Sequence, residues 1–175
     1  MSAGREDQTQ TDCHLRPATD NDWSMVRRWL HLPAVEKWWG PASTTEAEVI
    51  KALGATHSIA RIIEWRGQPV GYAHAVDAMT WGDELPEDLE AGTWDMDIFI
   101  AESHARGCGL GPLALSELRR EVFSTTLATA VCVFASIENE HAVRAYEKAG
   151  FHWRRIWQDP IHGPMWLLIA DRPQS

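Results

Sequence analysis

The chain has 175 residues, of which 45% are hydrophobic, and a formal net charge of −9. This length fits one domain with a substantial core. The negative charge argues against nucleic acid as a main partner, because counterion release requires a basic surface. Since apolar runs are too short to span a bilayer and the first residues are polar, we expect a cytoplasmic protein without a membrane partner. The cysteines fit a reducing compartment and predict neither disulfides nor a zinc site.

The first half of the chain predicts a strand, three helices and a β-hairpin. Residues 1–11 read as a disordered tail, and residues 12–175 as a single domain. Thr19 or Asp20 would cap the first helix, whose apolar positions recur at spacings of three and four. The hairpin is favoured by a short turn between two β-rich runs. The predicted elements are a strand at Cys13–Pro17, helices from residue 20 to 30, 34 to 39 and from Thr44 or Thr45 to about 53, and strands at 57–65 and 69–79.

The second half alternates strands with crossover helices. The predicted elements are an acidic loop at 80–92, strands at 94–100 and about 129–135, helices at 112–122 and about 138–149, and a final strand pair at 151–157 and 165–170. Hairpins mixed with two crossover helices indicate an α+β fold with a mixed sheet. The acidic loop is either a solvated segment or, beside a cleft, a means of concentrating a polycation.

A glycine-dense turn connects the strand at 94–100 to the next helix. The glycines of Arg106-Gly107-Cys108-Gly109-Leu110-Gly111 lack a Cβ, so backbone N–H groups could converge on an anion there. The helix N-terminus and the charge of Arg106 would add to that attraction. A Walker A loop is excluded because Gly-Lys-Ser/Thr is absent, and a Rossmann loop lacks its acidic residue. A tight turn without a ligand remains the alternative.

Asn139 and Tyr146 lie two turns apart on one predicted helix and therefore share a face. A carboxamide can bond an amide of a pantetheine-like chain, and a phenol can give a proton to a departing thiolate. The alternative is that Asn139 caps the helix and Tyr146 is a core aromatic residue.

Two segments together resemble the signatures of the GNAT acyl-CoA N-acetyltransferases. Arg106 to Gly111 resembles their Arg-x-x-Gly-x-Gly/Ala loop, and Asn139 to Phe151 resembles Asn-x-x-Ala-x-x-x-Tyr-Glu-Lys-x-Gly-Phe. Within this superfamily the chain looks most like the aminoglycoside 6′-N-acetyltransferases over nearly its whole length. The resemblance implies a mixed, mostly antiparallel seven-stranded sheet, splayed between its fourth and fifth strands and flanked by four to five helices.

The resemblance also assigns roles to residues. The donor acetyl-CoA would be bound at its diphosphate by Arg106, Gly107, Cys108, Gly109, Leu110 and Gly111, and at its pantetheine by Phe99, Ile100 and Asn139. Tyr146 would be the acid, and Asp97 the carboxylate beside the amine. The cationic acceptor would be bound by Trp38, Trp39, Asp95, Asp97 and Glu138.

One position departs from the family pattern. An acid that these enzymes place on the strand before the tyrosine helix falls at Phe134, so the base is open between Asp97 directly or through a water, Asp95 and Glu138. The implied reaction is direct attack of an amine on acetyl-CoA without a metal, with an aminoglycoside as acceptor and antibiotic resistance as its use. Alternative acceptors are protein N-termini or a siderophore-precursor amine, and a non-catalytic CoA-binding module is a further alternative. Either a monomer or a homodimer is compatible with the sequence.

Overall fold

The computed structural model describes residues 12–82 and 85–175, so the predicted tail at 1–11 and two acidic positions of the loop at 80–92 lie outside the described residues. Across these ranges, no helix combines the length and apolar character needed to cross a membrane. The α-helices are α2 (Trp23–Leu30), α3 (Pro33–Trp39), α4 (Ala42–Gly54), α5 (Ala78–Trp81), α6 (Leu110–Thr125) and α7 (Glu140–Lys148). The strands are β1 (Cys13–Pro17), β2 (Ser58–Trp65), β3 (Gln68–Asp77), β4 (Thr93–Ile100), β5 (Ala130–Ser136), β6 (His152–Asp159) and β7 (Gly163–Asp171).

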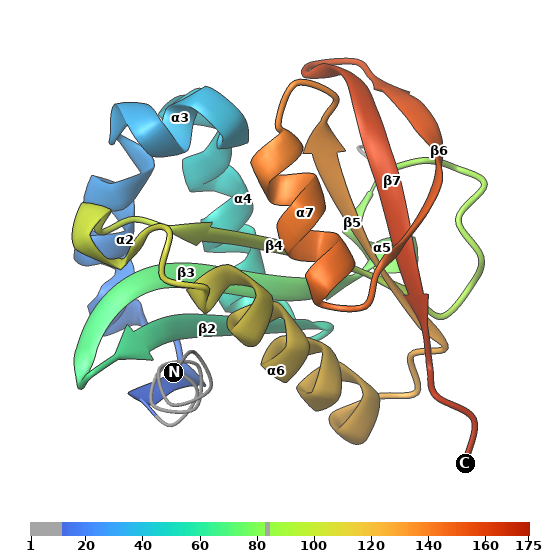
Figure 1. The fold of residues 1–175 in the computed structure, drawn as a ribbon, viewed down its shortest axis with the longest axis horizontal. Coiled ribbons are helices and arrows are strands. Elements are labelled where there is room, and N and C mark those ends of the chain that lie inside the picture. Colours follow the sequence, from blue (N-terminus) through green and yellow to red (C-terminus); the bar gives the residue numbers. More distant parts are fainter. Residues whose placement is uncertain (1–11, 83–84) are drawn as a thin grey trace, which may run out of the picture.

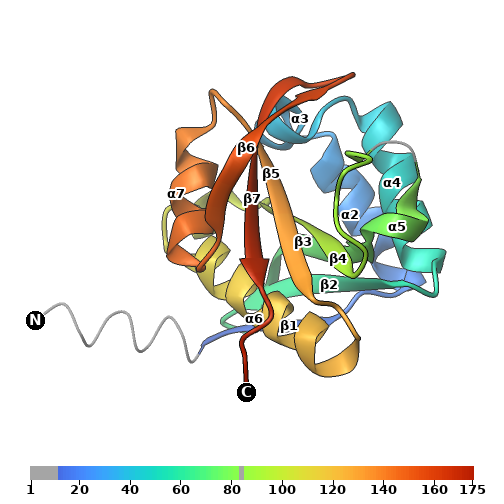
Figure 2. The same cartoon turned by 90° about the vertical axis from the view of Figure 1, so that its right-hand side faces the viewer.

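The seven strands form one sheet in the order β1-β2-β3-β4-β5-β7-β6 (Figures 1 and 2). Five of the neighbouring pairs are antiparallel, and only β4 and β5 run parallel. The parallel pair requires a crossover, which α6 supplies. The predicted mixed, mostly antiparallel sheet is therefore confirmed.

Helices cover both faces of the sheet (Figure 1), and the two largest apolar clusters lie between these helices and the sheet. On one face, α6 buries a row that repeats every four residues, made of Leu110, Ala114, Leu118 and Val122. On the other face, α2, α3 and α4 bury Val26, Val35 and Val49 against β2 and β3. Spacings of three and four place these side chains on one stripe of each helix, which explains why the helical periodicity in the sequence was informative.

The sheet splays between β4 and β5, as the family resemblance implied. Their parallel pairing covers Thr93–Ala130, Trp94–Val131 and Asp95–Cys132, and then stops. Beyond this point the rest of β4 pairs only with β3, and the rest of β5 only with β7. Continuing the register would bring Asp97 opposite Phe134, but here the strands diverge and leave a wedge between them.

Some element bounds differ from the sequence predictions. Helix α4 begins at Ala42, directly after Pro41, and α6 begins at Leu110 because the left-handed Gly109 (φ 77°) already ends the loop there. Helix α5 was not predicted. It takes the place of the expected strand end at Met79, whose N–H donates to the Asp77 carboxylate (3.0 Å).

A charged cluster fixes the start of α2 to the sheet. Arg16 on β1 donates to both carboxylate oxygens of Asp22 (2.9 and 2.8 Å), and the Thr19 N–H donates to the same carboxylate (2.9 Å). The pKa of Asp22 lies below its ordinary value of 3.8, mainly because the Arg16 guanidinium donates a hydrogen bond to its carboxylate. A group with a lowered folded-state pKa stabilises the protein above its unfolded pKa, and this stabilisation is lost as the pH falls.

The substitution Asp22→Asn should therefore lower the free energy of unfolding by about 2 kcal/mol at neutral pH, because charge-assisted bonds to Arg16 are lost. For a chain of this size, that corresponds to a decrease in Tm of about 6 °C. The difference between the variants should shrink below pH 4, where the carboxylate becomes protonated. Thermal unfolding of Asp20→Asn, at an exposed position of the same turn, is the control and should differ from wild type by less than about 0.5 kcal/mol.

Candidate functional site

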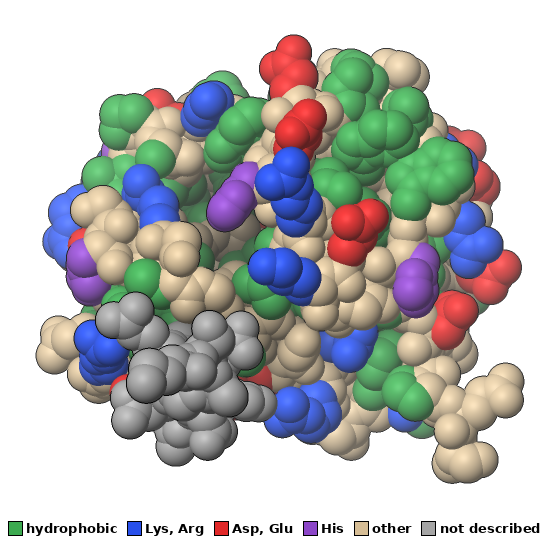
Figure 3. All heavy atoms as spheres, in the orientation of Figure 1, with side chains coloured by type: hydrophobic (Ala, Val, Ile, Leu, Met, Phe, Trp, Pro, Cys, Tyr) green, Lys and Arg blue, Asp and Glu red, His purple; other side chains and the backbone are tan. Residues whose placement is uncertain are grey.

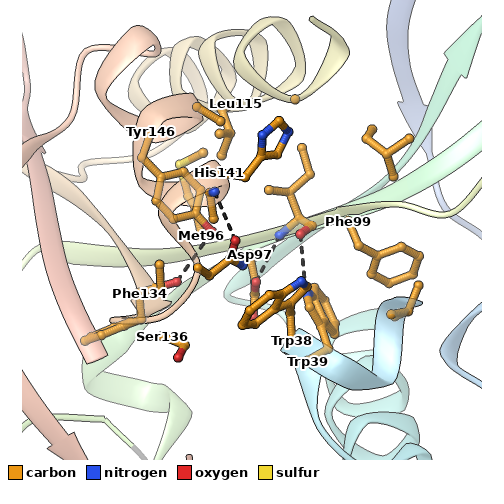
Figure 4. Close-up of a pocket in the computed structure, with 18 of the residues that line it drawn as sticks. Trp38, Trp39, Met96, Asp97, Phe99, Leu115, Phe134, Ser136, His141 and Tyr146 are labelled. Atoms are coloured by element: carbon orange, nitrogen blue, oxygen red, sulfur yellow. Dashed lines mark hydrogen bonds between the residues drawn. The ribbon is translucent and has the colours of Figure 1, made fainter. Parts of the chain in front are cut away.

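The wedge between β4 and β5 opens into a cavity of about 1090 Å³. Its walls come from β4, β5, α3, the start of α6, α7 and the loop between β6 and β7 (Figure 4). Segments from widely separated parts of the chain therefore meet around one cavity, which is of the size of small-molecule sites.

Carboxylates gather on the side of the cavity that faces α4. Asp95 and Asp97 alternate with Met96 on β4 and share one sheet face, as predicted, and Glu48 of α4 lines the same cavity. Burial, followed by the charge of Glu48, raises the pKa of Asp95 to about 8. Burial, then Asp95 and Glu48, raise the pKa of Asp97 well above its ordinary value, against the opposing hydrogen bond from the Ile98 N–H. A cation bound here would relieve this repulsion.

Two further titratable side chains border these carboxylates. The buried Cys132 thiol lies 3.8 Å from the Asp95 carboxylate at the last β4–β5 pair, and it can act as a weak donor there. His74 pairs with Asp97 across the β3–β4 register, and its Nδ1 lies 3.0 Å from the Tyr72 hydroxyl. Burial lowers the pKa of His74 to about 4, so its ring is neutral at neutral pH.

The adjacent indoles at the end of α3 have different environments. Trp39 packs edge-on against Phe99 (4.8 Å between ring centroids), and its Nε1 donates to the Ile98 carbonyl (3.1 Å) on β4. Trp38 lines the cavity, with the Lys37 ammonium 4.6 Å from its ring centroid. Both indoles line the cavity, and Trp39 in addition connects the end of α3 to β4.

The loop between β6 and β7 reaches the end of α3. A Cβ added at Gly40, whose φ is 100°, would lie 2.7 Å from His162 Cε1. Glycine is therefore required at position 40 for two reasons: the backbone has a positive φ, and the His162 ring occupies the space that a Cβ would need. This contact joins the two walls of the cavity that belong to the N-terminal and C-terminal halves of the chain.

Tyr146 and Asn139 both line the cavity from α7. The Tyr146 hydroxyl donates to the Phe134 carbonyl (3.4 Å), and Figure 4 shows this side chain on the same side of the wedge as Phe134. Burial, followed by the charges of Asp97 and Asp95, raises the pKa of Tyr146, so the phenol keeps its proton. The Asn139 side-chain oxygen caps α7 by accepting the Ala142 N–H (3.2 Å). The NH2 group of the same side chain can then donate to a ligand.

The glycine loop presents an open backbone surface. Gly107 and Gly109 have φ values of 72° and 77°, and a Cβ at either of them or at Gly111 would have no heavy atom within 4 Å. The first N–H groups of α6 end at this surface, where they can bind an anion. Arg106 donates to the carbonyls of Ile100 (3.1 Å) and Ala101, so its guanidinium fixes the loop to the end of β4. These features fit the diphosphate of coenzyme A.

Basic side chains surround the mouth of the cavity on the α6–α7 face. Figure 3 shows Lys and Arg side chains gathered beside a hollow on this face. Arg106, Arg144 and Lys148 all line the cavity. Because Asp95 and Asp97 point to the opposite face of the sheet, the cavity has a basic side and an acidic side.

Most of the sequence-predicted site residues come together here, and two do not. Glu138 is exposed, and neither it nor Cys108 lines the cavity. Sequence reasoning missed Glu48, Arg144 and Lys148. The spacing of Arg144 and Lys148, one turn apart on the helix of Asn139 and Tyr146, was a usable signal. No sequence signal pointed to Glu48, because its position at the cavity depends on how α4 packs against β4.

Comparisons with known proteins agree with this geometry. The sequence profile of the acetyltransferase (GNAT) domain matches residues 18–158. The aminoglycoside N(6′)-acetyltransferase type 1 of Klebsiella pneumoniae is 32% identical over 166 residues, which cover 90% of this chain and 82% of that protein.

Solved structures of AAC(6′)-Ib have the same architecture. Its complex with paromomycin and acetyl-CoA superposes with a TM-score of 0.81 at 27% identity, covering 92% of this chain and 94% of that one. Its complex with coenzyme A and kanamycin gives a TM-score of 0.81 at 27% identity, covering 91% and 95%. The profile match spans most of the chain, and the protein belongs to the GNAT acetyltransferase family.

Proposed function

We propose that this protein transfers the acetyl group of acetyl-CoA to a primary amine of a cationic acceptor, and that the acceptor is the 6′-amine of an aminoglycoside. The observation that carries the proposal is the opposite polarity of the two sides of one cavity, basic at the glycine loop and acidic at Asp95 and Asp97. An anionic donor and a cationic acceptor would each meet complementary charge. The relatives named for aminoglycoside 6′-acetylation support the same acceptor.

The donor side of the proposal rests on the loop and on α7. Backbone N–H groups from Gly107 to Gly111 and the start of α6 would bind the diphosphate, with Arg144 and Lys148 adding positive charge at the rim. The edge of β4 at Phe99 and Ile100 and the amide group of Asn139 would bind the pantetheine chain. Acetyl-CoA supplies the acetyl group as an activated thioester.

The acceptor side rests on the carboxylates of β4. Asp97 would hold the acceptor ammonium and accept its proton, since a carboxylate whose pKa is raised by burial is a stronger base. Asp95 would be a second site for positive charge, and Trp38 and Trp39 would border the acceptor. Glu138 is less well placed as a base because it is exposed.

The proposed reaction is a direct transfer. The acceptor ammonium first gives one proton to Asp97, the neutral nitrogen then forms a bond to the acetyl carbonyl carbon, and the bond from that carbon to sulfur breaks. The second proton that the nitrogen loses replaces the one that Tyr146 gives up. The Tyr146 hydroxyl would give its proton to the departing sulfur, and its raised pKa keeps that proton in place until then. Acetylation removes one positive charge from the acceptor. In a bacterium exposed to aminoglycosides, this chemistry would serve as antibiotic resistance in the cytoplasm, with residues 12–175 acting as one catalytic domain.

The function is tested by thiol release with acetyl-CoA and a panel of amines. We expect coenzyme A release with kanamycin, and slower or no release with peptides that have a free N-terminus. Acetyl-CoA alone should raise the Tm, because a ligand present at 100 times its Kd stabilises the folded protein by about 2.7 kcal/mol. Stabilisation without turnover of any amine would indicate a binding module, and faster turnover of peptides would indicate a protein N-terminal acetyltransferase.

The substitution Asp97→Asn should lower kcat/KM for kanamycin about 100-fold or more, because the amide can neither hold the ammonium by charge nor accept its proton. Acetyl-CoA affinity should stay within about twofold of wild type, since the phosphate loop is untouched. The matched control is Asp171→Asn at the exposed end of β7, which should retain full activity. An unchanged rate in Asp97→Asn would remove this residue from its proposed role.

For Tyr146→Phe, we expect kcat to fall about 100-fold while acetyl-CoA affinity changes little, because only the proton donor to sulfur is removed. Steady-state kinetics together with calorimetry on acetyl-CoA separate the two effects. Weaker acetyl-CoA binding with a normal kcat would contradict the assignment and would indicate a role for the hydroxyl in binding.

A further inference from the structure

The two walls of the wedge differ in chemistry at the point where they face each other. On β4, Asp95 and Asp97 lie on the sheet face that is turned to α4. On β5, Cys132 shares this face because its thiol meets Asp95, and Phe134 follows two residues later on the same face. Beyond the last β4–β5 pair the two strands diverge, and both Asp97 and Phe134 line the cavity between them. One strand therefore contributes a carboxylate to this cavity and the other an aromatic ring.

Phe134 is part of a larger aromatic surface. Its ring centroid lies 5.2 Å from that of Trp157 on β6, with the rings tilted by 55°. Met165 on β7 is next to Trp157 in the β6–β7 register and next to Ser136 in the β5–β7 register. Phe134, Trp157 and Met165 all line the cavity, and the rings of Phe134 and Trp157 are partly exposed. This surface is available to a ligand rather than filled by the core.

Three of the four carboxylates that line the cavity belong to elements other than β5, β6 and β7. The carboxylates that line the cavity near the acceptor come from β4 and α4, with Asp159 at the end of β6. The Asp159 carboxylate already accepts the N–H groups of Ile161 (2.7 Å) and His162 (2.9 Å) in its own turn. An acceptor in this cavity thus meets the carboxylates of β4 and α4, and on β5 and β6 an apolar surface beside one carboxylate that is already hydrogen-bonded.

We propose that Phe134 and Trp157 form an aromatic subsite that binds the apolar face of the acceptor's ring and determines the preference for a ring over a linear amine. This inference rests on the proposed function and assigns one of its acceptor contacts. A saturated sugar ring has an apolar C–H face that packs against aromatic rings, while its amine can reach Asp97 on the opposite wall. A linear polyamine of similar charge has no such face and would use only the carboxylate wall.

The test compares kanamycin, whose 6′-amine is one carbon from a saturated ring, with spermidine, which is linear. For the wild-type protein, kcat/KM should be at least about tenfold higher for kanamycin. Trp157→Ala should lower kcat/KM for kanamycin about tenfold through KM, and that for spermidine by less than about twofold. Phe134→Leu, which keeps an apolar side chain but removes the flat ring, should change the ratio in the same direction.

Trp153→Ala is the matched control. Trp153 lies on the same strand as Trp157, is 58% exposed and packs against Trp166 (6.0 Å between centroids) rather than against Phe134. It should leave both acceptors unaffected. Tm and acetyl-CoA affinity, measured for every variant, identify loss of folding.

The outcomes separate this inference from the proposed function. Turnover of both amines by wild type at equal kcat/KM, or equal losses for both acceptors in Trp157→Ala and Phe134→Leu, would overturn the aromatic subsite and leave acetyl transfer standing. Absence of thiol release with any amine would overturn both proposals. The wild-type ratio is informative even if a variant fails to fold.

Discussion

The parallel pairing of β4 with β5 stops at Asp95 and Cys132, and the other features of the site depend on that stop. A sheet that continued would bury Asp97 against Phe134 and leave no cavity. Because the strands diverge, the backbone edge of β4 and the side chains on both walls become accessible to ligands. The contacts of Trp39 with Ile98 and of His162 with Gly40 then support the separated walls from α3.

Electrostatics divides the cavity in a way that the net charge of the chain does not reveal. Burial and the nearby charge of Glu48 raise the pKa values of Asp95 and Asp97, and a cation bound beside them would offset this effect. On the α6–α7 face, Arg106, Arg144 and Lys148 give the opposite polarity. The protein thus keeps two kinds of charge on the two faces of one sheet, and the sheet separates an anionic donor from a cationic acceptor until they meet in the wedge.

The sequence predicted the fold well because its signals are local. Helix periodicity, the turn between β2 and β3, and the glycine loop each depend on a few neighbouring residues, and the family, the mixed sheet and the splay are confirmed. Boundaries were less accurate where capping decides them, as at Ala42, Leu110 and the unpredicted α5. Asp97 and Tyr146 belong to recognisable segments and line the cavity, and their roles stay predictions. The positions of Glu48 and Trp157 at the cavity follow from packing between distant elements, which no local pattern encodes.

Arg106 has a consequence for how binding at one end of the cavity affects the other. Its guanidinium donates to the carbonyls of Ile100, the last residue of the strand that carries Asp97, and of Ala101, the residue after it. Two hydrogen bonds therefore connect the glycine loop to the strand that carries Asp97. If the loop binds the nucleotide part of coenzyme A as proposed, contacts far from the thioester help to align its carbonyl carbon. In such an arrangement, a short thioester without the nucleotide loses catalytic rate as well as affinity, because remote binding energy contributes to alignment.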